Sequence, residues 1–146
     1  MNPTRILCSA LLVAILALVP GCGGKKYHES LQMPNFNYGE ILDGHMKRVT
    51  LALQKVQDLQ TAKQAANDLT AINIDLDDLV YNMPRLSDEG QFQLGKLAGQ
   101  HLSVVEPMSR DIARIPQLDD VLGAPIAEMM GYLKQMMTGN VDGVTP

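Results

Sequence analysis

Apolar residues recur at steps of three and four through most of this chain, and this period limits its fold more than any other feature. The period is clearest in the middle of the sequence, where no glycine or proline interrupts it. Steps of three and four place side chains on one face of an α-helix. The middle segment therefore predicts an amphipathic helix with the buried stripe Ala62, Ala65, Leu69, Ile72, Leu76, Leu79 and Met83.

A shorter stripe of the same kind comes before it and consists of Leu42, Met46, Val49, Leu53 and Val56. The phase slips between the two stripes, and Thr61 followed by Gln64 has the spacing of a capping box. We therefore expect two helices separated by a turn near residues 58–60. The alternative is one continuous helix of about 65 Å, which would need a long partner that this chain does not contain.

A third helix is expected after Pro84, with Ser87 as its N-cap and acidic residues in its first turn. Pro107 lies inside this element and predicts a kink near Ser103. Pro116 is expected to end it. The buried stripe expected for this helix is Leu94, Leu97, His101, Val104, Met108, Ile112 and Ile115.

A fourth helix is expected to begin at Asp119 or Asp120 as its cap, with Pro125 in or near its first turn. Gly139 is expected to end it, because glycine readily adopts the conformation that closes a helix. Its buried stripe is Leu122, Ile126, Met129, Leu133 and Met136.

Four amphipathic helices joined by short turns predict an all-α fold, most economically a small up-and-down four-helix bundle over residues 40–139. A chain of 146 residues, 46% of them apolar, provides one such domain and no second one. No segment has the alternating pattern of a β-strand. Residues 140–146 are expected to form a disordered tail.

The first 22 residues have the pattern of an export signal. Arg5 is followed by a nearly unbroken apolar run over residues 6–19, which is shorter than the roughly 20 residues that a membrane-spanning helix needs. The run is followed by Val19-Pro20-Gly21-Cys22, which resembles the lipobox of bacterial lipoproteins. The resemblance implies that residues 1–21 are a cleaved signal peptide and that Cys22 is lipid-modified. The alternative is an ordinary cleaved signal.

This resemblance implies a location in the cell membrane or the outer membrane, lipid-anchored and facing the periplasm or the exterior. Gly23 after the cysteine, in place of an aspartate, is similar to the outer-membrane pattern of enteric lipoproteins. Residues 22–39 are expected to be the lipidated cysteine and a flexible tether. Tyr27, Phe36 and Tyr38 in this segment dock on the bundle or lie at the lipid interface.

One further stretch, residues 58–69, resembles a recurring Asp-x-x-Thr/Ser-Ala-x-x-Ala-x-x-x-Leu arrangement. The arrangement occurs in small exported helical proteins of bacteria that have no assigned activity. The resemblance therefore implies no function, and we expect Ala62, Ala65 and Ala66 to allow close helix packing.

Composition and motifs argue against several classes of function. The net charge is −4, and no run of basic residues is longer than Lys25-Lys26, so nucleic-acid binding is not expected. Cys8 would leave with the signal and Cys22 would be acylated, which leaves no thiol for a disulfide, a metal site or a nucleophile. The sequence has no recognisable serine triad, phosphate loop or metal-ligand spacing. We therefore expect no enzyme activity, no cofactor and no resident metal.

Two sets of side chains are weighed as binding residues. Soft thioethers on the fourth helix, with His101, are the candidate ligands for Cu(I) in an exported protein. The candidates are Met129, Met130, Met136 and Met137, with His101. Core packing is the favoured interpretation of these methionines, because Met is a common filler of helical cores. The acidic residues Asp75, Asp77 and Asp78 are interpreted as solvated, because helical geometry spreads their side chains around the helix instead of gathering them at one site.

These observations favour a membrane-anchored lipoprotein of the bacterial envelope, with a non-catalytic structural or partner-binding module. The expected partners are the membrane, through lipidated Cys22, and an envelope protein or a second copy of the chain. The alternative is a periplasmic carrier of copper or of a small apolar ligand that uses the methionine-rich helix.

Overall fold

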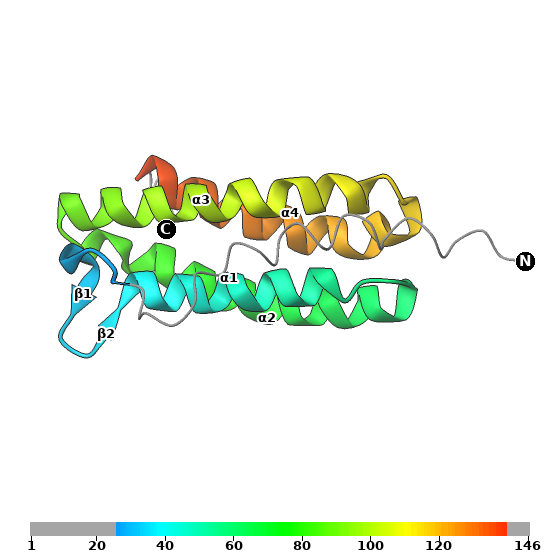
Figure 1. The fold of residues 1–146 in the computed structure, drawn as a ribbon, viewed down its shortest axis with the longest axis horizontal. Coiled ribbons are helices and arrows are strands. Elements are labelled where there is room, and N and C mark those ends of the chain that lie inside the picture. The colour runs from blue at the N-terminus through cyan, green and yellow to red at the C-terminus, as the bar shows by residue number, and fades with distance from the viewer. Residues whose placement is uncertain (1–25, 140–146) are drawn as a thin grey trace, which may run out of the picture.

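The structure is a computed structural model, and it describes residues 26–139. The predicted all-α four-helix bundle is confirmed (Figure 1). The helices are α1 (Tyr38–Gln54), α2 (Leu59–Asn82), α3 (Asp88–Ala113) and α4 (Pro116–Thr138). Two short 3-10 helices are η3 (Glu29–Leu31) and η4 (Met83–Arg85), and an antiparallel pair of strands is β1 (Gln32–Met33) and β2 (Phe36–Asn37).

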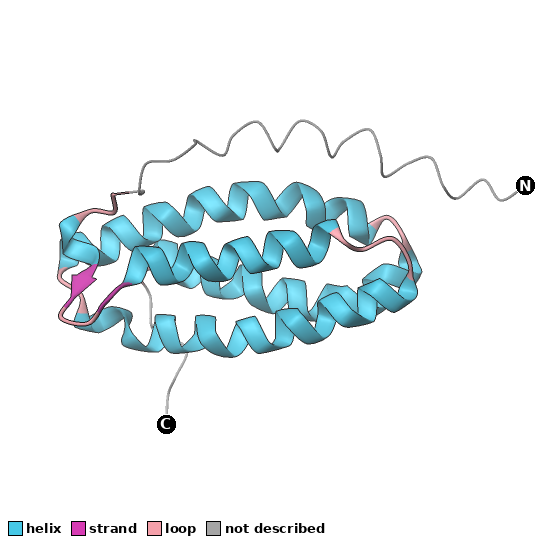
Figure 2. Ribbon diagram, turned by 60° about the horizontal axis from the view of Figure 1, so that its bottom comes forward, coloured by secondary structure: helices cyan, strands magenta, loops and turns pink. Residues whose placement is uncertain are grey.

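Successive helices run in opposite directions and form two pairs, α1 with α2 and α3 with α4 (Figure 1). The pairs lie against each other so that α1 contacts α3 and α2 contacts α4. Helices α2 and α3 are therefore diagonal neighbours, and η4 crosses one end of the bundle to join them. We call this end, which also holds η3, β1 and β2, the hairpin end. The opposite end, with the α1–α2 and α3–α4 links, is the turn end (Figure 2).

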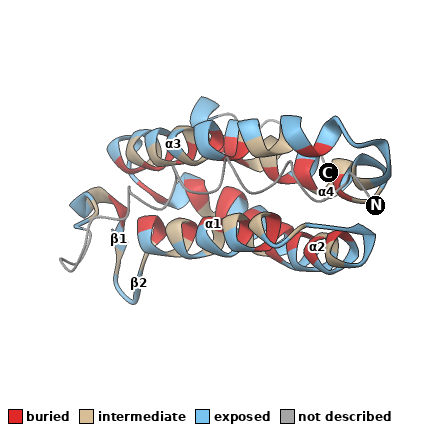
Figure 3. Ribbon diagram, turned by 45° about the vertical axis from the view of Figure 1, so that its right-hand side comes forward, coloured by how far each residue is buried: buried red, intermediate tan, exposed pale blue. Residues whose placement is uncertain are grey.

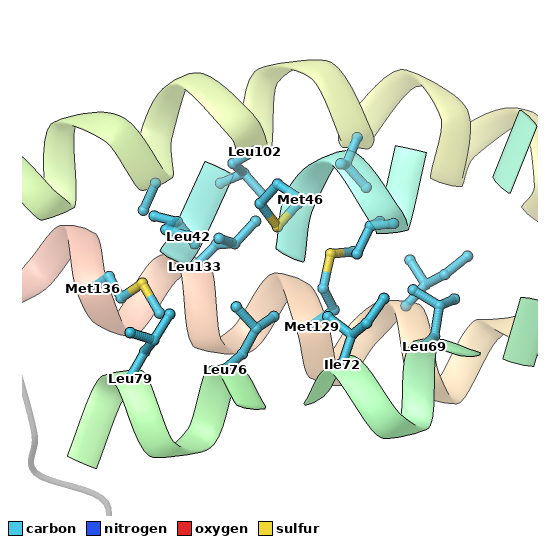
Figure 4. Packing of buried hydrophobic residues seen from close by; sticks show 14 of the residues in the cluster. Leu42, Met46, Leu69, Ile72, Leu76, Leu79, Leu102, Met129, Leu133 and Met136 are labelled. Carbon is cyan, nitrogen blue, oxygen red and sulfur yellow. The ribbon is translucent and has the colours of Figure 1, made fainter. Parts of the chain in front are cut away.

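The core runs along the whole bundle and takes side chains from all four helices (Figures 3 and 4). The predicted stripes of the second and fourth helices are confirmed completely, since every member is buried. The first stripe is buried from Leu42 to Leu53, and Val56 lies beyond the end of α1, partly buried. The 3.6-residue period was therefore sufficient to find three of the four buried faces.

The stripe expected on the third helix is confirmed at Leu94 and Ile112, which are buried, but not at every member. Val104 and Ile115 are 41% and 46% exposed, whereas the buried face of α3 includes Gly95, Ala98 and Leu102. A Cβ atom on Gly95 would lie 2.7 Å from the carbonyl oxygen of Met136. Because α4 approaches α3 this closely, small residues rather than large ones occupy the centre of the contact. The large apolar residues of α3 therefore mark only part of its buried face.

The predicted break between the first two helices is confirmed, but its cap is at a different residue. Asp58 is the N-cap of α2, and its carboxylate accepts a hydrogen bond of 2.8 Å from the backbone N–H of Thr61. The Thr61 hydroxyl accepts one of 3.1 Å from the backbone N–H of Asp58. Thr61 therefore closes the capping box as the third helical residue instead of opening it. The turn lies at residues 55–58, earlier than expected.

Helix α4 begins earlier than expected, and Pro116 is its first residue. Ile115 occupies the N-cap position, and Asp119 lies in the first turn. Proline suits this position because its missing N–H would have no partner inside the helix and its φ angle is already helical. The expected roles of Pro116 as a terminator and of Asp119 or Asp120 as a cap are therefore wrong. Pro125 lies in the interior of α4, and α3 continues through Pro107.

The described part of the expected tether, residues 26–39, is folded onto the bundle. Leu31 and Tyr38 are buried, β1 pairs with β2, and α1 already begins at Tyr38. The expectation of a flexible tether here is wrong, and the sequence pattern gave no sign of the two short strands. Strands of two residues are too short to produce an alternating pattern. The predicted signal peptide (1–21), the lipidated Cys22 and the tail (140–146) lie outside the described residues.

Candidate functional site

Two side chains from separate segments meet at the carboxylate of Asp43, on the face formed by α1 and α3. The Tyr27 hydroxyl donates a hydrogen bond of 2.7 Å to Asp43 Oδ2. His101 Nε2 lies 2.6 Å from Asp43 Oδ1, at hydrogen-bonding distance. Asp43 is in α1, His101 is in α3 and Tyr27 precedes η3. We call these three residues the Asp43 junction.

The environment of the Asp43 junction is shaped by a glycine. A Cβ atom on Gly39 would lie 2.5 Å from the Tyr27 ring, so the ring occupies space that only a glycine leaves free. Burial raises the pKa of the Tyr27 hydroxyl, and the neighbouring Asp43 carboxylate raises it further. Tyr27 therefore stays protonated and donates its hydrogen bond throughout the physiological pH range.

Chemically, the Asp43 junction joins segments. A carboxylate that orients an imidazole is one part of a nucleophilic triad, and here the same carboxylate also accepts the Tyr27 hydroxyl, so it links the N-terminal segment, α1 and α3. The sequence pattern singled out His101 as a candidate ligand, and it placed Tyr27 among the residues that dock on the bundle or lie at the lipid interface. It did not identify Asp43, because a carboxylate on a mostly polar helix side has no distinctive pattern.

A second polar cluster lies between α1 and α2, next to the hairpin. A shallow pocket of about 410 Å³ is present here. His45 Nδ1 is buried and lies 3.5 Å from Asp75 Oδ2. Arg48 Nη1 lies 3.6 Å from the same oxygen. Burial lowers the pKa of His45, partly offset by Asp75. The pocket is lined by Phe36, Tyr38, Ile41, His45, Asp75, Asp78, Leu79, Asn82 and Arg85.

The acidic cluster of α2 is divided by the helix as expected. Asp75 and Asp78 line the pocket toward α1. Asp77 lies on the α4 side, where burial raises the pKa of Tyr132 and the Asp77 charge raises it further. Within residues 26–139, no group of three or more His, Cys, Asp or Glu side chains is placed to hold a metal ion.

The candidate methionines do not form a common site. Met129 and Met136 are buried in the core, where Met136 lies beside Leu79 and Leu133 (Figure 4). Met137 is half exposed and covers Gly99 of α3, and Met130 lies at the edge of the core. The helix therefore divides each adjacent pair between core and surface, and His101 is held by Asp43.

The lipidation candidate, Cys22, lies outside the described residues. Across residues 26–139, no helix has the length and apolar character needed to cross a bilayer. No protein-family model matches the chain, and no curated protein and no solved structure matches it either.

Proposed function

We propose that this chain is a lipid-anchored lipoprotein of the bacterial envelope, whose helical bundle is a non-catalytic structural or partner-binding module facing the periplasm or the exterior. The observation that carries the proposal is the sequence Val19-Pro20-Gly21-Cys22 after an apolar run of signal length. Acylation of Cys22 with two or more chains would give stable anchoring without a spanning helix.

The position of the folded domain is consistent with such an anchor. Four residues separate Cys22 from Tyr27, which is fixed to the bundle by its hydrogen bond to Asp43. A lipid on Cys22 would therefore hold the bundle itself close to the bilayer. This short connection suits a module that acts on a partner at the membrane surface.

The lipid anchor is tested by producing the full-length chain in a bacterial host with a tag after Pro146. The Cys22 peptide is expected to begin at this cysteine and to have the added mass of its acyl chains, and the protein is expected to float with membranes. Cys22→Ser abolishes both results, whereas the matched Cys8→Ser variant retains them. An unmodified mature terminus would contradict the proposal.

The partner-binding role is tested by chemical cross-linking in the native cells, followed by mass spectrometry. The expected result is one or a few envelope partners, or a second copy of this chain, cross-linked through one helix face. Cross-links scattered over all four helices at random would contradict a partner-binding module.

The carrier alternative has less support from the fold. Met129 and Met136 contribute their thioethers to core packing, so a ligand would reach them only by opening the bundle. We therefore do not favour a carrier of copper or of a small apolar molecule.

A further inference from the structure

The exposed aromatic side chains of the described residues gather at the hairpin end. Phe36 in β2 is 44% exposed, Tyr81 near the end of α2 is 68% exposed, and Phe92 near the start of α3 is 65% exposed. The large apolar residues exposed near the turn end are aliphatic, such as Leu59 and Ile115. Tyrosine favours the membrane–water interface through its polar end, and phenylalanine is common among the apolar side chains of interfacial segments.

The hairpin presents Phe36 in a fixed position. Its ring lies 5.3 Å from the ring of Tyr38, in a tilted arrangement, and Tyr38 is buried. The strand pairing of Met33 with Phe36 closes the loop that contains the exposed Pro34 and Asn35. The half-exposed phenylalanine therefore belongs to a short, closed hairpin, where its ring rests on Tyr38 at the rim of the pocket beside His45.

The chain also enters the bundle near this end. The Tyr27 ring lies over Gly39, the second residue of α1. Five peptide steps join Cys22 to Tyr27, and they span at most about 17 Å when fully extended. From Gly39 to Gln54, the last residue of α1, the helix rises about 22 Å. A lipid on Cys22 can therefore bring the hairpin end of an upright bundle to the bilayer, but not its turn end.

We propose that the hairpin end is a membrane-docking surface, on which Phe36, Tyr81 and Phe92 contact the interfacial region of the bilayer. This inference rests on the proposed lipidation of Cys22, which supplies the main anchor, while the aromatic side chains set the orientation. The bundle then stands with its long axis away from the membrane and presents the turn end to the envelope space.

The charges of the hairpin end indicate which lipid surface it fits. The charged residues that lie here are Glu29, Glu40, Asp78, Asp88 and Glu89, with Lys26 and Arg85. Carboxylates outnumber cations among these residues, so attraction to anionic lipid does not drive the contact. The docking surface therefore fits a zwitterionic lipid interface and is expected to be insensitive to salt.

The test uses the absence of tryptophan from the chain. The full-length lipoprotein variants Phe36→Trp and Phe92→Trp each contain a single tryptophan, at the hairpin end, and Leu59→Trp is the matched control at the turn end. Indole fluorescence is excited selectively over that of the four tyrosines. Each variant is reconstituted in phosphatidylcholine vesicles with and without brominated acyl chains. We expect brominated lipid to quench the indole of either hairpin-end variant at least threefold more than the indole of the turn-end control. Circular dichroism checks that each variant is folded.

The other outcomes separate the two proposals. Intact mass and vesicle flotation report acylation independently of the fluorescence. Acylated, floating protein with equal quenching at both ends, or with no quenching in the two hairpin-end variants, overturns the docking surface and leaves the anchor. Missing acyl chains overturn the proposed function and this inference with it. A photocrosslinker at position 36 that labels a protein in cells, rather than lipid, also overturns the docking surface.

Discussion

Asp43 receives hydrogen bonds from two side chains that are far apart in the sequence, and it joins them on one face of the bundle. Its two oxygens serve different partners, Tyr27 and His101, at 2.7 and 2.6 Å. Hydrogen bonds to a charged group are stronger than neutral ones, and a partly buried group left without its partner has a large desolvation cost. The Asp43 junction is therefore the most informative place to test how the N-terminal segment is held.

We predict that Asp43→Ala lowers the free energy of unfolding by about 2 to 4 kcal/mol, because it leaves two partly buried groups unpaired. Urea unfolding of residues 23–146 measures the loss. Tyr27→Phe is expected to lose about 1 kcal/mol in the wild-type background and almost nothing in the Asp43→Ala background, because the shared bond is already absent. The exposed Tyr81→Phe is the control and stays within about 0.5 kcal/mol of wild type. Additive losses would show that Tyr27 and Asp43 act separately.

His45 provides a pH-dependent contribution to stability. Burial and Arg48 lower its pKa below the ordinary 6.5, against the opposite effect of Asp75. Between the lowered folded value and 6.5, the unfolded chain binds more protons than the folded chain. The contribution of neutral, buried His45 to stability is therefore complete above about pH 6.5, and it is lost as the pH falls toward the lowered pKa of the folded state. We predict that His45→Gln flattens the decline in stability between pH 7 and 5.

This prediction is measured by urea unfolding at several pH values within that interval. Gln57→Ala changes an exposed side chain that does not titrate, so it serves as the control and is expected to leave the decline unchanged. An identical slope in His45→Gln and wild type would place the titrating group elsewhere.

At the scale of elements, the contact between α3 and α4 depends on the small residues of α3. Gly95 faces the backbone of Met136 and Met137, and Gly99 faces the Met137 side chain. A flexible methionine can move away from an added methyl group, but a helix backbone cannot do so without shifting the whole element. The two glycines of α3 therefore have different tolerances for substitution.

We predict that Gly95→Ala lowers stability by about 1 to 3 kcal/mol, because the new Cβ would lie 2.7 Å from a carbonyl oxygen of α4. Gly131→Ala is the matched control in α4, where nothing lies within 4 Å of the added Cβ. It is expected to raise stability by up to about 1 kcal/mol, through the higher helix propensity of alanine. Thermal unfolding measures both changes, and stabilisation by Gly95→Ala would show that the helices are less tightly packed.

The same elements show how far the sequence could predict the fold. Helical period identified the buried faces of α2 and α4 because large apolar residues occupy them. It identified the buried face of α3 only in part, because glycine and alanine form part of the contact and were not counted. It also gave no sign that Asn73 is buried, which is possible because its side-chain amide donates to the Pro125 carbonyl oxygen of α4 at 3.0 Å.

The candidate sites were predictable only as single residues. His101 was recognised as a chemical group, but its partner Asp43 lies 58 residues away and follows from the packing of α1 against α3. The pocket beside His45 depends on the hairpin, whose strands have two residues each. Features made by long-range packing of ordinary polar residues leave no local pattern in a sequence.

At the scale of the whole molecule, the N-terminal segment is part of the folded domain. Leu31 is buried, and the Ser30 carbonyl oxygen lies 2.6 Å from where a Cβ of Gly90 would be, so η3 fits closely against α3. Tyr27 completes the contact on the α1 side. The bundle is thus closed at its hairpin end by the residues that lead to Cys22.

This closure predicts that a chain beginning at Tyr38 is helical but less stable than one beginning at Lys26. Loss of the buried Leu31 side chain and of the Tyr27 hydrogen bond is expected to lower the free energy of unfolding by about 3 to 5 kcal/mol. Urea unfolding of the two fragments measures the difference. Leu31→Ala in the longer fragment should account for about 2 to 4 kcal/mol of it, whereas the exposed Gln32→Ala should cost little. Equal stability of the two fragments would mean that the segment contributes nothing to the packing of the bundle. The predicted difference would mean that residues 26–37 are a structural part of the bundle and stabilise the packing of α1 against α3.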